Sequence, residues 1–251
     1  MKQIPNIFTL LNLLCGCMAI VFTLQASLAT VSNESESFII IPEKIYLASI
    51  MIGIAAIIDF LDGFVARLLN AASELGRQLD SLSDVVSFGA APGMIAYQFL
   101  RLSYAGEPGG LDTNMLLLLP AFFLPLAGAY RLARFNIDTK QTQSFTGLPI
   151  PAAGLLIASF PLIYWHSSDV WLVQLLQNKW FWYALIIIVS WLMISRLPMM
   201  ALKFKNFSPR DNLLKYVLIA ISIAIAFSLQ WLSVPAIFIV YVAMSLLSKD
   251  K

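Results

Sequence analysis

Charged residues are scarce in this sequence. Asp, Glu, Lys and Arg make up 12% of its 251 residues, whereas hydrophobic residues make up 59%. A soluble domain averages roughly 25% charged residues. So few charges are not enough to cover a soluble globule of this size, which favours a polytopic membrane protein. The formal net charge of +2 gives no reason to expect a nucleic-acid partner.

Histidine and cysteine are almost absent. The single histidine, His166, follows Trp165 at the predicted outer end of a helix, where we interpret it as an interfacial anchor. A histidine-based catalytic centre is therefore not expected. Cys15 and Cys17 stand two apart in an apolar run and do not face each other on a helix, so they are predicted to pack as small apolar side chains.

Long apolar runs predict an all-α fold with about eight transmembrane helices, because about 20 apolar residues cross a bilayer. The chain is expected to form one integral membrane domain, residues 1–251, with a six-helix core over 5–196. A cytoplasmic basic loop, 197–211, and two extra helices within 212–248 follow. The predicted spans are residues 6–29, 44–69, 77–99, 114–136, 147–166, 178–196, 212–228 and 231–248.

Basic residues are distributed unequally between the two sets of loops. Thirteen of the 16 Lys and Arg fall on one side, and Lys44, Arg101 and Lys179 fall on the other. Lys and Arg accumulate in cytoplasmic loops, so both termini are predicted to be cytoplasmic, in a cell membrane of bacterial type. The run of Lys203, Lys205 and Arg210 is interpreted as a patch facing lipid headgroups.

Four aspartates lie at the cytoplasmic ends of two neighbouring predicted helices. Asp59 and Asp62 are three residues apart on one, and Asp80 and Asp84 are four apart on the next, so each pair shares a helix face. Intramembrane acids are costly and usually functional. Pairing with Arg67 or Arg77, or helix capping, is the structural alternative.

Mutual repulsion among four carboxylates requires cations to offset it. Oxygen ligands without Cys or His favour Mg²⁺ or Mn²⁺ over zinc. Two divalent ions are expected, an arrangement suited to phosphodiester chemistry.

The stretch from Asp59 to Asp84 reads DxxDGxxAR, eight residues, then GxxxDxxxD. This pattern resembles the signature of the CDP-alcohol phosphotransferases at every fixed position. The resemblance implies that a hydroxyl attacks the lipid-side phosphorus of a CDP-activated substrate and that CMP leaves. It implies metal binding by all four aspartates, and Asp84 as general base. It also implies a CDP site lined by Gly63, Ala66, Arg67 and Gly76, and by the face that carries Asn6, Thr9 and Asn12.

Three further segments resemble the phosphatidylserine synthase branch of that family: "RLARFN" (131–136), "FTGLPIPAAG" (145–154) and "SRLPMMALKFKNFS" (195–208). The expected substrates are CDP-diacylglycerol and L-serine, and the resemblance implies a homodimer in the lipid membrane. An arginine fork suits the serine carboxylate, so Arg131, Arg134 and Asn136 are the candidate acceptor residues. Either arginine could be the clamp.

Two other functions stay open from the sequence. A sister enzyme that uses glycerol 3-phosphate or inositol phosphate would need a denser basic pocket. A divalent-cation transporter would place acids at several membrane depths, whereas here they gather at one level.

Overall fold

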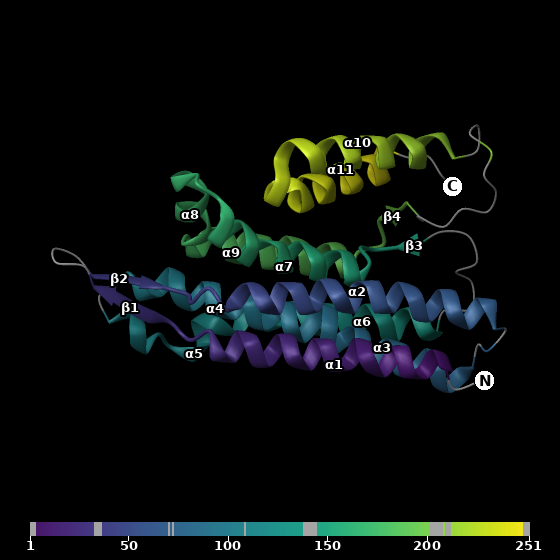
Figure 1. Cartoon of the computed structure of the whole chain (residues 1–251), viewed down its shortest axis with the longest axis horizontal. Helices are drawn as coiled ribbons and strands as arrows, with labels where there is room; N and C mark the ends of the chain where they lie inside the picture. Colours follow the sequence, from purple (N-terminus) through teal and green to yellow (C-terminus); the bar gives the residue numbers. More distant parts are fainter. Residues whose placement is uncertain are drawn as a thin grey trace.

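Helices dominate the computed structural model, which describes residues 4–32, 37–69, 71, 73–107, 109–137, 145–200, 208 and 212–247. Figure 1 shows most of them running along the long axis of the molecule. The longer helices are α1 (Ile4–Gln25), α2 (Ile45–Leu68), α3 (Glu74–Asp84), α4 (Ala91–Ala105), α6 (Phe123–Ile137), α7 (Ile150–His166), α9 (Lys179–Ile194), α10 (Leu213–Leu229) and α11 (Ser233–Leu247). The short ones are α5 (Met115–Leu118) and α8 (Val170–Leu176).

Four of the described helical stretches are long and apolar enough to cross a membrane: Ile4–Gln25, Ile45–Leu68, Met115–Ile137 and Leu213–Leu247. The pair α8 and α9, bent by 67°, makes a fifth if it counts as one span. α1, with 22 residues, is about 33 Å long, enough for the hydrocarbon core. The chain is therefore an integral membrane protein.

The stretch Leu213–Leu247 is a hairpin, as the sequence predicts. Gln230 breaks it with a φ of 45°, and α10 and α11 pack against each other. Figure 1 shows the pair lying to one side of the other helices. Most of its side chains are exposed, as expected for a lipid-facing hairpin.

The apolar core is centred on α4, whose face from Ala91 to Leu102 is almost fully buried. Its aromatic part lies toward the end of the molecule remote from the N-terminus. Phe99 stacks on Trp182 of α9 with ring centroids 4.8 Å apart, and Phe160 of α7 meets the same ring edge-on. The Trp182 indole N–H donates to the Leu176 carbonyl at 2.8 Å. This packing supports the helices whose opposite ends carry the aspartates.

The predicted helix 77–99 is not one regular α-helix. Its α3 and α4 parts are joined by a π-helical turn, Val85–Ala90. Pro92 offers no N–H to the carbonyl four residues before it, which favours the wider turn. π-turns are frequent at functional sites, and this one begins directly after Asp84.

The all-α prediction is confirmed, and two short antiparallel strand pairs join its loops. β1 (Ala29–Ser32) pairs with β2 (Ser37–Ile40) in the predicted outer loop. β3 (Phe145–Thr146) pairs with β4 (Pro198–Met199), so part of the predicted loop 197–211 is ordered against the start of α7. Residues 201–207 and 209–211 of that loop, which include Lys203, Lys205 and Arg210, lie outside the described residues.

Candidate active site

Three aspartates from two helices meet at one point. Carboxylate oxygens of Asp59 and Asp62, on α2, and of Asp80, on α3, all lie within 4.8 Å of one another. Asp62 is buried and the other two are half-buried. We call these three residues the aspartate cluster. The sequence prediction that the two helices bring their acids together is therefore confirmed for these three residues.

Asp84 lies one helical turn beyond Asp80 and is buried, with 7% of its surface exposed. It is outside the 4.8 Å group, but it interacts electrostatically with Asp59, Asp80 and Asp62. The Asn12 amide donates to Asp84 Oδ1 at 3.5 Å. Asp84 therefore adjoins the cluster, held by a neutral donor rather than by a cationic side chain.

The polar face of α1 packs directly on the acids. The Thr9 hydroxyl donates to Asp62 Oδ2 at 2.9 Å. The Ser83 and Ser87 hydroxyls donate in turn to the backbone carbonyls of Thr9 and Asn12, at 3.0 and 2.9 Å. Gly16 permits this contact, because a Cβ there would stand 2.7 Å from the Ser87 Cα. Thr9 and Asn12 thus orient carboxylates, a relation that sequence spacing did not reveal.

The aspartates are not explained by ion pairing. In the described ranges, ion pairs join Arg77 to Glu74 at 2.7 Å and Lys179 to Glu107, and neither includes an aspartate of the cluster. Asp80 Oδ1 is buried with no hydrogen-bond partner among those same residues. Buried anionic oxygens without partners are unstable unless a cation compensates them. The cluster therefore fits a divalent ion with oxygen ligands.

Small residues flank the acids on α2 and α3. A Cβ placed on Gly63 would meet no atom of the described residues within 4 Å, so the helix is bare beside Asp62. Ala66 is half-buried, and Arg67 is exposed at the end of α2. Gly76 lies against Asn6, since a Cβ there would approach Asn6 Oδ1 to 3.0 Å. Ser73 caps α3 by accepting from the Gly76 N–H, three residues along the chain.

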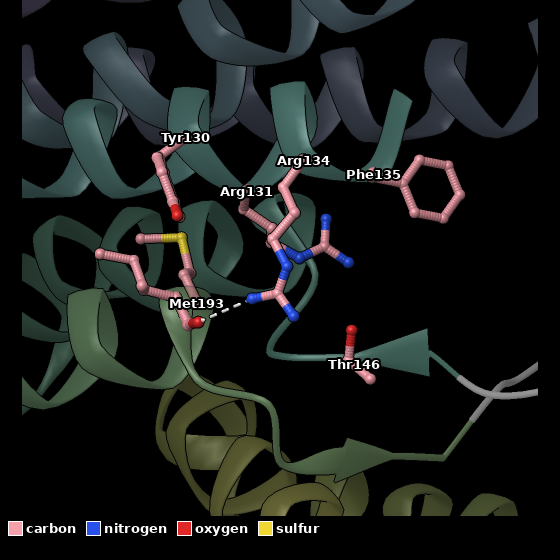
Figure 2. Close-up of a pocket in the computed structure, with 7 residues that line it drawn as sticks. Tyr130, Arg131, Arg134, Phe135, Thr146 and Met193 are labelled. Carbon is pink, nitrogen blue, oxygen red and sulfur yellow. Dashed lines mark hydrogen bonds between the residues drawn. The ribbon is translucent and has the colours of Figure 1, made fainter. Parts of the chain in front are cut away.

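A second site, which we call the arginine pocket, lies between α6, β3 and the C-terminal end of α9 (Figure 2). Figure 2 shows the Arg131 and Arg134 guanidinium groups next to each other, on the side where Thr146 of β3 lies. The Arg134 guanidinium donates to the Ile194 carbonyl at 3.3 Å. The pocket is lined by Tyr130, Arg131, Arg134, Phe135, Thr146, Met193 and Ile194.

Arg131 links the two sites. It interacts electrostatically with Asp84 on one side, and it lines the arginine pocket on the other. Its Nε is buried and without a partner in the part of the chain that the structure describes. An unpaired guanidinium N–H of this kind is suited to an anionic ligand.

Asn136 is not a lining residue of the arginine pocket. Its amide donates to Ser81 Oγ of α3 at 2.8 Å, so it ties α6 to the helix that carries Asp80. Thr146, Met193 and Ile194 were missed as pocket residues. A signal for Thr146 was present in "FTGLP", where Gly147 takes a φ of +76° and turns the chain after β3.

The chain matches known proteins over most of its length. Residues 2–177 match the CDP-alcohol phosphatidyltransferase family. A CDP-diacylglycerol–serine O-phosphatidyltransferase of Bacillus subtilis is 33% identical over 166 residues, 65% of this chain and 78% of that protein. Proteins of the same name from Helicobacter pylori and Mycobacterium leprae are 31% identical over 235 residues and 27% identical over 248. These matches cover 89% and 96% of this chain, and 81% and 72% of the relatives.

Proposed function

This chain belongs to the CDP-alcohol phosphatidyltransferase family, and from that premise we propose that it is a CDP-diacylglycerol–serine O-phosphatidyltransferase. It transfers the phosphatidyl group of CDP-diacylglycerol to the hydroxyl of L-serine and releases CMP. The names of the relatives and one structural observation support this proposal. That observation is Arg131, which lines the arginine pocket and interacts electrostatically with Asp84.

The geometry of the aspartates supports a role for them as metal ligands. Asp59, Asp62 and Asp80, with Asp84, would hold two divalent ions, Mg²⁺ or Mn²⁺. Bound ions would neutralise charge on the diphosphate and on the departing CMP. The buried, unpaired Asp80 Oδ1 supports this assignment. Thr9, through its bond to Asp62, keeps one carboxylate in the required orientation.

Asp84 is the general base of the proposed reaction. It accepts the proton of the serine hydroxyl, whose oxygen forms a bond to the lipid-side phosphorus while the bond from that phosphorus to the CMP oxygen breaks. A carboxylate is a weak base toward an alcohol, so the proton moves as the new bond forms. Asn12, which donates to Asp84, fixes the direction of the carboxylate.

The two substrates occupy opposite sides of Asp84. The open helix surface at Gly63, with Ala66, Arg67 and Gly76, accepts the cytidine diphosphate, together with the Asn6–Thr9–Asn12 face of α1. Arg131 and Arg134 bind the serine carboxylate, which a planar guanidinium can hold through both oxygens. Asn136 acts less directly, by holding α6 on α3 through Ser81.

We also propose the membrane arrangement. The eight spans predicted from the sequence cross the bilayer as one domain, and both termini and the aspartates lie on the cytoplasmic side. The protein is a homodimer. The distribution of Lys and Arg supports this orientation. A cysteine placed at Ser73, in a chain without Cys15 and Cys17, should then react with a membrane-impermeant reagent only after cells are permeabilised. Labelling in intact cells would reverse the orientation.

The activity has a direct test. Purified protein with Mn²⁺ or Mg²⁺ and CDP-diacylglycerol should release CMP and form phosphatidylserine when L-serine is added, and chelation of the metal should stop both. Equal CMP release with glycerol 3-phosphate, accompanied by the corresponding lipid product, would overturn the assignment of serine and favour the sister activity.

A further inference from the structure

The arginine pocket depends on a strand pair whose two halves are about 50 residues apart in sequence. The Gly147 N–H donates to the Leu197 carbonyl at 2.9 Å, and the Leu148 N–H donates to the Leu192 carbonyl at 3.0 Å. These bonds fasten the segment before α7 to the end of α9. They set Thr146 opposite Met193 and Ile194, and so fix one wall of the pocket.

The outer strand of this pair is held by α11. The Met200 N–H, next to β4, donates to Ser245 Oγ at 3.1 Å. The Met200 carbonyl accepts from the Tyr241 hydroxyl at 3.2 Å. Tyr241 and Ser245 are four residues apart and share a helix face, so α11 satisfies both backbone groups of one residue. All three residues are buried.

These bonds are unusual for this hairpin, because most side chains of α10 are exposed and the other side chains of α11 are half-buried or exposed. A lipid-facing hairpin has no need of a tyrosine and a serine in its buried face for hydrophobic packing. In a membrane, however, backbone N–H and C=O groups outside regular structure must find partners. The two hydroxyls provide these partners to Met200, and at the other end of the hairpin Trp231 packs on His166 with ring centroids 4.4 Å apart.

The same tyrosine also lies near Arg131, with which it interacts electrostatically. One side chain of α11 therefore bonds the residue that follows β4 and lies in the environment of an arginine that lines the pocket. The family match ends at residue 177, so Tyr241 and Ser245 lie in a part of the chain that the match does not include.

We propose that Tyr241 and Ser245 are positioning residues for the acceptor site: by holding Met200, they set the β3–β4 wall and the orientation of Arg131. This inference rests on the proposed function for the identity of the acceptor. It assigns the C-terminal hairpin a part in recognising the acceptor alcohol, and no part in binding CDP-diacylglycerol.

The test compares three variants in a steady-state assay. In Tyr241→Phe and in Ser245→Ala, the KM for L-serine should rise by about three- to tenfold, as expected for the loss of one hydrogen bond. The kcat and the KM for CDP-diacylglycerol should stay within about twofold of the wild type. Tyr183→Phe is the matched control, because its hydroxyl also bonds a backbone carbonyl, that of Leu117, but far from the pocket. Its serine KM should not change.

Each outcome has a separate meaning. An unchanged serine KM in both variants, with normal thermal unfolding, overturns the inference. So does an equal loss in every kinetic parameter with a lower unfolding temperature, which would indicate a structural role alone. If the wild type instead uses another acceptor, the proposed function fails, and the same comparison is made with the KM for that acceptor.

Discussion

The aspartate cluster and the arginine pocket adjoin each other, but they are built differently. The cluster comes from α2 and α3, which follow one another in the chain, and its acids lie within 22 residues, from Asp59 to Asp80. The pocket takes residues from α6, β3 and the end of α9, and α11 holds it from outside. The proposed chemistry therefore rests on a local motif, whereas the proposed acceptor site depends on long-range contacts.

The largest effect should follow from a change in the proposed catalytic aspartate. Asp84→Asn keeps the size of the side chain but removes the base, and kcat should fall by about 10²- to 10⁴-fold. The rate of CMP release measures this fall in kcat. Asp112→Asn, an equivalent change in the 3-10 turn Gly110–Asp112, serves as control and should be silent. Near-normal turnover in Asp84→Asn would remove Asp84 as the base.

A change in the pocket should act on one substrate only. Arg131→Lys keeps the charge but loses the planar fork, so the KM for L-serine should rise by about 10- to 100-fold. The KM for CDP-diacylglycerol should stay the same. Arg101→Lys, at an arginine bonded to Gln98, is the control. An unchanged KM for L-serine in Arg131→Lys would mean that Arg134, and not Arg131, binds the serine carboxylate.

A smaller effect is expected from the contact between α1 and the cluster. Thr9→Val removes the hydroxyl that holds Asp62, and the apparent affinity for Mn²⁺ should fall roughly tenfold, as for other residues that orient metal ligands. Thr23→Val, on the same helix, removes a hydroxyl that bonds only the Ala19 carbonyl in the described structure and should leave the affinity unchanged. Equal losses in both variants would point to helix packing instead.

The smallest effect concerns the bare surface of α2. Gly63→Ala adds a methyl where the described residues leave open space, so it should fold and even stabilise the helix by about 0.5–1 kcal/mol. If cytidine lies there, the KM for CDP-diacylglycerol should rise about fivefold, below the effect of one methyl group in a closed pocket. Gly53→Ala on the same helix is equally unhindered and should be kinetically neutral. Identical kinetics in the two variants would place the nucleotide elsewhere.

The sequence was sufficient for features that depend on local pattern. Apolar runs predicted the helices, and the spacing of Asp59, Asp62 and Asp80 predicted that they meet. These features are decided within a few helical turns, where periodicity is informative.

Features that need tertiary contacts were not predictable in this way. The pairing of β3 with β4 joins two-residue strands that have no alternating pattern, and the bonds of Tyr241 and Ser245 to Met200 connect residues more than 40 positions apart. Asn136 was assigned to the acceptor from its neighbours in sequence, and its bond to Ser81 of α3 was not predicted. Side-chain direction at the end of α6 depends on what packs against it, which a sequence pattern does not specify.

The π-helical turn Val85–Ala90 has a consequence for insertions and deletions. Each residue rotates an α-helix by about 100°, and a π-turn accommodates one residue more than an α-turn does. A one-residue deletion between 85 and 90 would therefore let the helix become regular while turning its two halves relative to each other. Either Asp80 would leave the cluster and Asp84 its position beside it, or Phe99 would leave its stack on Trp182. The length of this segment is thus fixed by both ends of the molecule at once.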